Sequence, residues 1–141
     1  MLAPSFEGAH KSMDSLHITL FFIGVFAIVQ IPMTVMVGFR RLQTGIQFLD
    51  GGDQTLLRRM RAHANFIETV PITLLAMAAA EVSGLGATWL WLGGCSLLAG
   101  RLMHAAILVL KGWGNPRAAG MILTFLPLAG FGGWAVLHSV I

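Results

Sequence analysis

Residues 58–80 read RRMRAHANFIETVPITLLAMAAA, and this stretch decides the class of fold. Its first half carries three arginines, a histidine, an asparagine and a glutamate, and it continues without a break into a run of apolar residues. Over the whole chain 56% of the residues are hydrophobic and only 11% are charged, whereas a soluble domain carries roughly 25% charged residues. This composition, with a mean hydropathy of +0.78, predicts an integral membrane protein.

The apolar residues gather in four blocks along the chain. Each block is close to the ~20 residues that a helix needs to cross the hydrocarbon core, and none shows the strict alternation of a barrel strand. We therefore expect an all-α fold, a single domain over residues 1–141 formed by an integral membrane four-helix bundle. The approximate bounds expected for the helices are 15–41, 55–83, 88–111 and 116–140.

The basic residues of the chain concentrate in two of the three connections between these blocks. The connection between the second and third blocks, EVSGLGAT at residues 81–88, has none. By the positive-inside rule the two basic connections face the cytoplasm and both termini lie on the other side. The net charge of +3 then reflects membrane topology and does not indicate nucleic-acid binding. The basic residues in question are Arg40, Arg41, Arg58, Arg59, Arg61, Lys111 and Arg117.

Polar side chains of the second helix fall on one face. Arg58, Arg61, Asn65, Glu68 and Ile72 recur at spacings of three and four residues, and such residues share a helix face. The third helix has a similar pair, Arg101 and His104, and the first helix ends with Arg40 and Arg41. Because ionisable groups at membrane depth nearly always face a bundle interior or a wet cavity, we expect three helices to direct cations to one cytoplasm-facing cavity.

Two interpretations of this polar face remain open at this point. Arg61 and Glu68, or Glu68 and Arg101, can form internal salt bridges that brace the helices with no ligand present. However, Glu68 is the one acidic group on the face, so a packed bundle would leave positive charge uncompensated in a low dielectric. An anionic ligand would remove that deficit. No metal site is expected, because Glu68 and His104 are the only plausible buried ligands.

The sequence also resembles a known family. RAHANFIETVP at residues 61–71, GRLMH at 100–104 and NPRAAG at 115–120 are similar to the MAPEG family, the membrane-associated proteins in eicosanoid and glutathione metabolism, and in particular to its small bacterial members. The resemblance covers nearly the whole chain. It implies a homotrimer in the bacterial inner membrane, with glutathione bound between neighbouring subunits near the cytoplasmic side. It also implies conjugation of glutathione to lipophilic electrophiles, or reduction of lipid hydroperoxides.

The resemblance further implies roles for individual residues. Two carboxylates of glutathione suit arginine forks, its amino group suits a glutamate, and its peptide groups suit an asparagine. At the start of the fourth helix, Arg117 falls where the enzymes place an arginine beside the thiol, and a guanidinium near a helix N-terminus favours the nucleophilic thiolate. We therefore expect Arg117 to be catalytic and glutathione to be held by Arg41 (or Arg40), Arg58, Arg61, Asn65, Glu68, Arg101 and His104.

The chain departs from the family in one respect that bears on its activity. It contains no tyrosine, whereas the eicosanoid-producing members carry tyrosines around the site, so a specialised eicosanoid synthase is not expected. A general transferase or peroxidase with glutathione as co-substrate is compatible with the sequence. So is a non-catalytic membrane lipid-binding or scaffold protein of the same fold. The single cysteine, Cys95, is expected to be packed inside the third helix.

Overall fold

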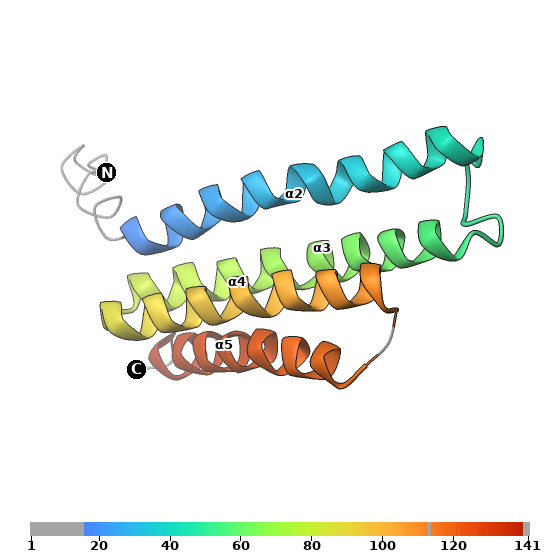
Figure 1. Ribbon diagram of the computed structural model, residues 1–141. Helices are drawn as coiled ribbons and strands as arrows, with labels where there is room; N and C mark the ends of the chain where they lie inside the picture. The colour runs from blue at the N-terminus through green and yellow to red at the C-terminus, as the bar shows by residue number, and fades with distance from the viewer. Residues whose placement is uncertain (1–15, 113, 140–141) are drawn as a thin grey trace, which may run out of the picture.

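Four long helices make up the structure, a computed structural model that describes residues 16–112 and 114–139 (Figure 1). Each helix is long and apolar enough to cross a membrane, and each begins and ends within three residues of its expected bounds. The prediction of an all-α four-helix membrane fold is therefore confirmed. The helices are α2 (His17–Thr44), α3 (Gln54–Val82), α4 (Ala87–Leu110) and α5 (Asn115–Ser139).

The bundle has a central pair of helices and two flanking ones. The central helices α3 and α4 each pack against the other three, whereas α2 and α5 lie on opposite sides of this pair (Figure 1). All connections are short, so consecutive helices run antiparallel and the α2–α3 and α4–α5 connections lie at the same end of the bundle. The basic residues of the two connections therefore gather at one end.

Local sequence signals explain where α2 ends and α3 begins. The C-cap of α2 is Gly45, whose φ of 71° is a left-handed conformation that glycine adopts at little cost. Asp53 caps α3, because its side chain accepts a hydrogen bond of 2.6 Å from the Leu56 amide. Such a cap satisfies one of the amides that a helix start leaves unpaired. The two caps fix the ends of the loop that joins these helices.

A glycine pair brings α4 and α5 into backbone contact. A Cβ atom added at Gly100 would lie 2.8 Å from the carbonyl oxygen of Gly120, and one added at Gly120 would lie 2.9 Å from that of Gly100. One turn before Gly100, the Ser96 hydroxyl donates to the carbonyl of Leu123 at 2.8 Å. Small residues permit this close packing, which membrane helices use in place of the hydrophobic effect.

At the opposite end of the bundle, α3 caps the start of α2. The Glu81 carboxylate accepts hydrogen bonds from the amides of Ile18 at 3.0 Å and Thr19 at 2.8 Å. The first amides of a helix have no partner within the helix and carry a partial positive charge, so a carboxylate is well suited to them. Glu81 therefore holds the two helices together where the chain enters the bundle.

Much of the bundle surface is apolar and exposed. Only 17% to 39% of each membrane-spanning window is buried within the chain, which leaves large side chains such as Leu20, Ile28 and Leu126 exposed on its surface. Cys95 belongs to this exposed surface. The expectation that its thiol is packed inside the bundle is therefore wrong: the helical period places position 95 on the outer face of α4, next to exposed Trp91 and Leu92.

Candidate functional site

Arg101 is the centre of the polar groups inside the bundle. Its side chain is only 2% exposed, and its Nε donates to the hydroxyl of Thr124 on α5 at 2.8 Å. One terminal nitrogen lies 3.3 Å from the carbonyl oxygen of Asn65 and 3.2 Å from the Thr69 hydroxyl on α3. The other contacts the Met121 sulfur at 3.3 Å. Arg101 thus joins three helices through neutral groups, and no carboxylate among the described residues balances its charge.

Glu68 lies on the same part of α3 but does not meet Arg101. Its side chain is exposed on the single chain, and within the described residues it forms neither a hydrogen bond nor an ion pair. The internal salt bridges considered above, Arg61–Glu68 and Glu68–Arg101, are therefore not formed. Glu68 lies at the midpoint of α3, about 21 Å from either end. A carboxylate at that depth is costly unless it faces a partner or a wet cavity.

Asn65 and His104 flank the Arg101 cluster. The Asn65 side chain donates to the carbonyl of Arg61, one turn earlier, at 2.8 Å, so its amide oxygen is left as an acceptor. His104 is buried with 3% of its surface exposed, and it lies against Gly120, the glycine of the α4–α5 contact. Asn65 meets Arg101 through its backbone carbonyl, and His104 follows Arg101 by three residues on the same helix.

Arg117 lies in the first turn of α5, beside a cavity of about 410 Å³ that has mostly apolar walls. Its neighbours in that wall include Asn115, Met121 and Phe125. Met121 is also the residue whose sulfur contacts Arg101, so the cavity and the Arg101 cluster share a wall. The arrangement can place an apolar molecule within reach of the Arg117 guanidinium and of the N-terminus of α5.

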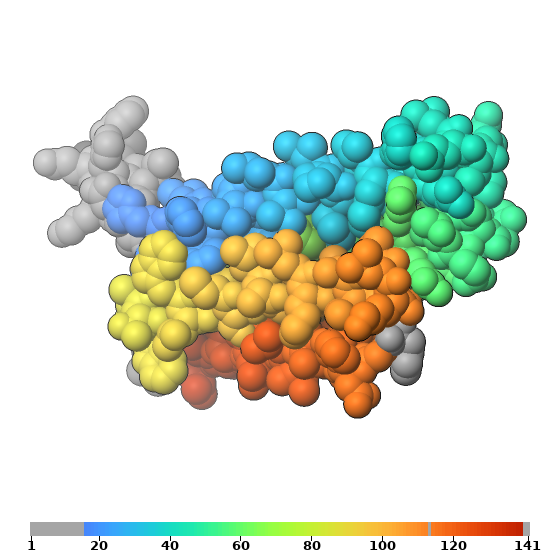
Figure 2. All heavy atoms as spheres, in the orientation of Figure 1, coloured from blue at the N-terminus to red at the C-terminus, as the bar shows by residue number. Residues whose placement is uncertain are grey.

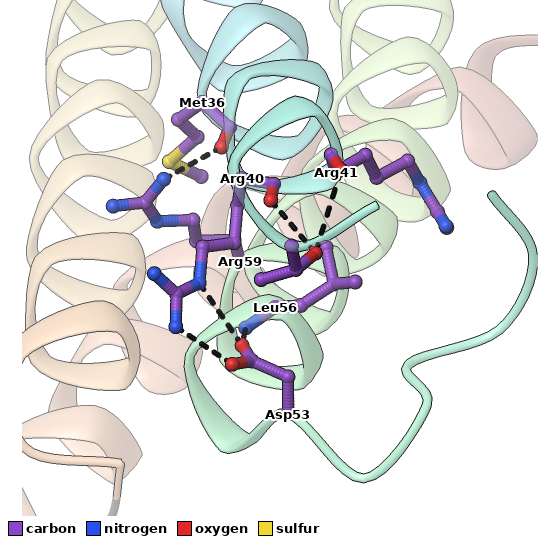
Figure 3. Close-up of polar contacts among 7 residues, drawn as sticks. Met36, Arg40, Arg41, Asp53, Leu56 and Arg59 are labelled. Atoms are coloured by element: carbon purple, nitrogen blue, oxygen red, sulfur yellow. Dashed lines mark hydrogen bonds and ion pairs between the residues drawn. The ribbon is translucent and has the colours of Figure 1, made fainter. Parts of the chain in front are cut away.

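The arginines at the end of α2 are committed to the neighbouring loop. Arg40 forms a two-fold contact with Asp53, with distances of 3.1 Å and 2.6 Å, and Figure 3 shows the same carboxylate capping Leu56. This pairing with the Arg40 guanidinium, together with the Leu56 amide, lowers the pKa of Asp53. Arg41 extends to the other side and donates to carbonyls of the loop, at 2.9 Å for Gln47 and 3.1 Å for Leu49.

Not all the cations therefore meet in one cavity. Arg40 and Arg41 bind groups of the α2–α3 loop. Arg59 donates to the Met36 carbonyl of α2 at 2.9 Å (Figure 3). Arg58 and Arg61 line a separate cavity at the end of the bundle. The expectation that three helices direct their cations to one cavity is therefore wrong. The arginines of α2 find loop carbonyls and Asp53 nearer at hand, and Arg58 and Arg61 of α3 line a cavity that does not include Arg101 of α4.

Two contacts involve residues that the spacing argument did not identify as partners. His63 lies off the polar face of α3, and its Nε2 is 3.0 Å from the side-chain nitrogen of Gln30 and 3.2 Å from the Thr34 hydroxyl on α2. Lys111 shares the cavity of Arg58 and Arg61. In the sequence, Gln30 could have been identified as a lone amide within an apolar block. Lys111 could have been identified as a cation directly after the end of α4.

The chain is similar to one known protein family and to two curated bacterial membrane proteins. The MAPEG family model matches residues 19–137. Inner membrane protein YecN of Escherichia coli (strain K12) is 38% identical over 64 residues, which cover 45% of this chain and 49% of YecN. YecN of Escherichia coli O6:H1 gives the same values. The chain thus matches about half the length of these relatives, and the match to the family model extends over all four helices.

Proposed function

Because the chain belongs to the MAPEG family, we propose that it binds glutathione and transfers it to lipophilic electrophiles, or uses it to reduce lipid hydroperoxides. One observation carries this proposal. Buried Arg101 contacts α3 at Asn65 and Thr69, and Glu68 lies between these two positions in the sequence but forms no ion pair with Arg101. Glutathione at neutral pH carries two carboxylates and one ammonium group. It therefore matches a site that holds a cation and an anion apart.

The remaining groups fit the same ligand. Asn65 offers an amide oxygen to a peptide N–H, and Arg61 and His104 lie one turn from Asn65 and Arg101 respectively. Arginine binds carboxylates through paired hydrogen bonds, which suits the two ends of glutathione. Arg41 enters this set only if its guanidinium leaves the loop carbonyls that it now contacts. The core of the proposed site is accordingly Asn65, Glu68, Arg101 and His104.

The chemistry needs the sulfur as a thiolate. A free thiol has a pKa of roughly 8.5, so a guanidinium and a helix N-terminus beside the sulfur would favour ionisation at neutral pH. In conjugation the thiolate forms a carbon–sulfur bond and the electrophile loses its leaving group. In hydroperoxide reduction, two glutathione molecules give a disulfide while the hydroperoxide becomes an alcohol and water. The apolar walls of the Arg117 cavity suit the lipophilic reactant in both cases.

A second function is favoured by one specific observation. The nitrogens of Arg101 already have acceptors on α3 and α5, so this side chain can act as an internal brace with no ligand. A lipid-binding or scaffold protein of the same fold would keep the brace and make no use of glutathione. The two functions differ in whether glutathione binds at all.

Binding is tested with Glu68→Gln, which keeps the shape of the side chain and removes its charge. We expect glutathione affinity to fall roughly 10- to 150-fold, the effect of losing a charge-assisted contact on the order of 1.5–3 kcal/mol. The measurement is calorimetric titration of the purified, folded variant. Glu81→Gln is the matched control, because Glu81 caps α2 at the far end of the bundle. Equal affinity of Glu68→Gln and wild type would remove Glu68 from the site.

Catalysis is tested with Arg117→Ala. We expect glutathione binding to persist, because other arginines hold the carboxylates, and turnover of a chloronitrobenzene to fall by ~10²-fold, the scale of one preorganised electrostatic contact. The ultraviolet absorbance of bound thiolate against pH checks the cause, since ionisation should shift to higher pH in the variant. An identical titration in the two proteins would end the catalytic role of Arg117. Absence of thiolate at neutral pH in both would favour the non-catalytic function.

We propose assembly as a homotrimer, which membership of the MAPEG family supports and which would cover the same charges. Glu68 and Arg61 are exposed on the single chain, and polar groups at membrane depth need a neighbour that covers them. We expect native mass spectrometry from mild detergent to give three chains per particle, with glutathione bound only to that species. A monomer that binds glutathione tightly would contradict a site shared between subunits.

The orientation in a bacterial inner membrane is inferred from the basic connections. We expect the α2–α3 loop to face the cytoplasm and both termini to lie on the other side. Gln47 is exposed in this loop, so Gln47→Cys can be labelled after the native exposed thiol is removed by Cys95→Ser. An impermeant maleimide should react only after the membrane is opened. Reaction in intact spheroplasts would reverse the topology.

A further inference from the structure

A basic cavity lies where α3 begins and α4 ends. It has a volume of about 310 Å³, and three of its lining residues, Arg58, Arg61 and Lys111, are cations, whereas none is acidic. The first turns of α3 (green) and the last turn of α4 (orange) lie side by side at this end of the molecule (Figure 2). We call this site the rim cavity.

The backbone after α4 is shaped to admit an arginine. Gly112 has a φ of 81°, and a Cβ atom added there would lie 2.8 Å from Nε and 2.9 Å from Cζ of Arg58. Any other residue would therefore be strained and would displace the guanidinium. The absence of a side chain at this position lets Arg58 lie against the chain directly after Lys111, so two cations of different helices share one wall of the rim cavity.

The charges of the rim cavity are not compensated within the described part of the chain. The side-chain nitrogens of Arg58, Arg61 and Lys111 have no hydrogen-bond acceptor there and no ion pair. Other arginines at the same end differ, because Arg40 is paired with Asp53 and Arg59 donates to Met36. Like charges around a small cavity repel one another, and a bound anion would offset this electrostatic repulsion.

The walls and the position of the cavity indicate the kind of anion. Besides the cations, Leu57 and Leu108 line it, so it offers apolar contact beside the charges. Arg58 lies about 6 Å along α3 from its first residue, and Lys111 directly follows α4, which places both at the level of the lipid headgroups. Basic pockets between membrane helices at this level bind acidic phospholipid headgroups, and guanidinium groups pair well with phosphate.

We infer that the rim cavity binds the headgroup of an acidic phospholipid of the adjacent leaflet. The phosphate contacts Arg58 and Lys111, and the glycerol and upper acyl chain lie against Leu57 and Leu108. This site goes beyond the proposed glutathione site, which is centred on Arg101 deeper in the bundle, and it assigns Arg58 to lipid. Lys111, which directly follows α4, is not one of the residues of the proposed glutathione site.

The test uses the full-length protein, purified and delipidated in mild detergent. Its thermal unfolding midpoint is followed while phosphatidylglycerol, phosphatidylcholine or inorganic phosphate is added. We expect phosphatidylglycerol to raise the midpoint, whereas phosphatidylcholine and equimolar inorganic phosphate do not. Lys111→Gln should weaken the phosphatidylglycerol response about fivefold, the scale of one cation beside an anionic headgroup. Arg59→Gln is the matched control, because it removes a cation at the same end that faces α2 and should leave the response unchanged.

Three outcomes would overturn the inference. An equal response to phosphatidylcholine would mean that any lipid stabilises the bundle, and an equal response to inorganic phosphate would mean a site for soluble anions. Competition between glutathione and phosphatidylglycerol would mean that the rim cavity is part of the glutathione site. Glutathione affinity measured by calorimetry should be the same in Lys111→Gln and wild type. Failure of glutathione to bind either protein would end the proposed function and leave the lipid result standing.

Discussion

The buried guanidinium of Arg101 is the interaction on which the rest of the interior depends. It belongs to α4 and reaches acceptors on α3 and α5, so the relative positions of three helices are fixed by one planar group. All the acceptors are neutral. A salt bridge would have neutralised this charge, whereas neutral oxygens hold it in place and leave it available to a bound anion.

This arrangement requires the close approach of α4 and α5. Gly100 directly precedes Arg101, and its contact with the Gly120 backbone lets Arg101 reach Thr124, one turn further along α5. A larger residue at either glycine would move the helices apart by the width of a methyl group or more. Packing and polar chemistry are therefore coupled here, because the same small residues that join the helices set the reach of the charged side chain.

At the basic end of the bundle, the arginines divide into two groups with different tasks. Arg40, Arg41 and Arg59 find acceptors in the α2–α3 loop or on α2, and they stabilise a connection that contains left-handed residues such as Gly51 and Gly52. Arg58, Arg61 and Lys111 surround a cavity instead. The basic residues at this end of the bundle thus divide between those that stabilise the loop and those that line the cavity.

The sequence alone determined the class of fold and the polar face of α3 to which the proposed site belongs. Four apolar blocks of membrane-spanning length specify four helices, and the period of 3.6 residues specifies which side chains of α3 share a face. Both follow from the geometry of a single helix, which is why the expected helix bounds agree with the structure.

The tertiary structure decided which partner each long side chain takes. Periodicity could not indicate that Arg41 turns to the loop carbonyls or that Glu68 stays apart from Arg101. An arginine reaches acceptors over several ångströms, so its partner depends on the rotation of each helix about its axis and on the path of the intervening loop. Those quantities are set by packing between distant segments, as where Gly100 meets Gly120, and no local pattern encodes them.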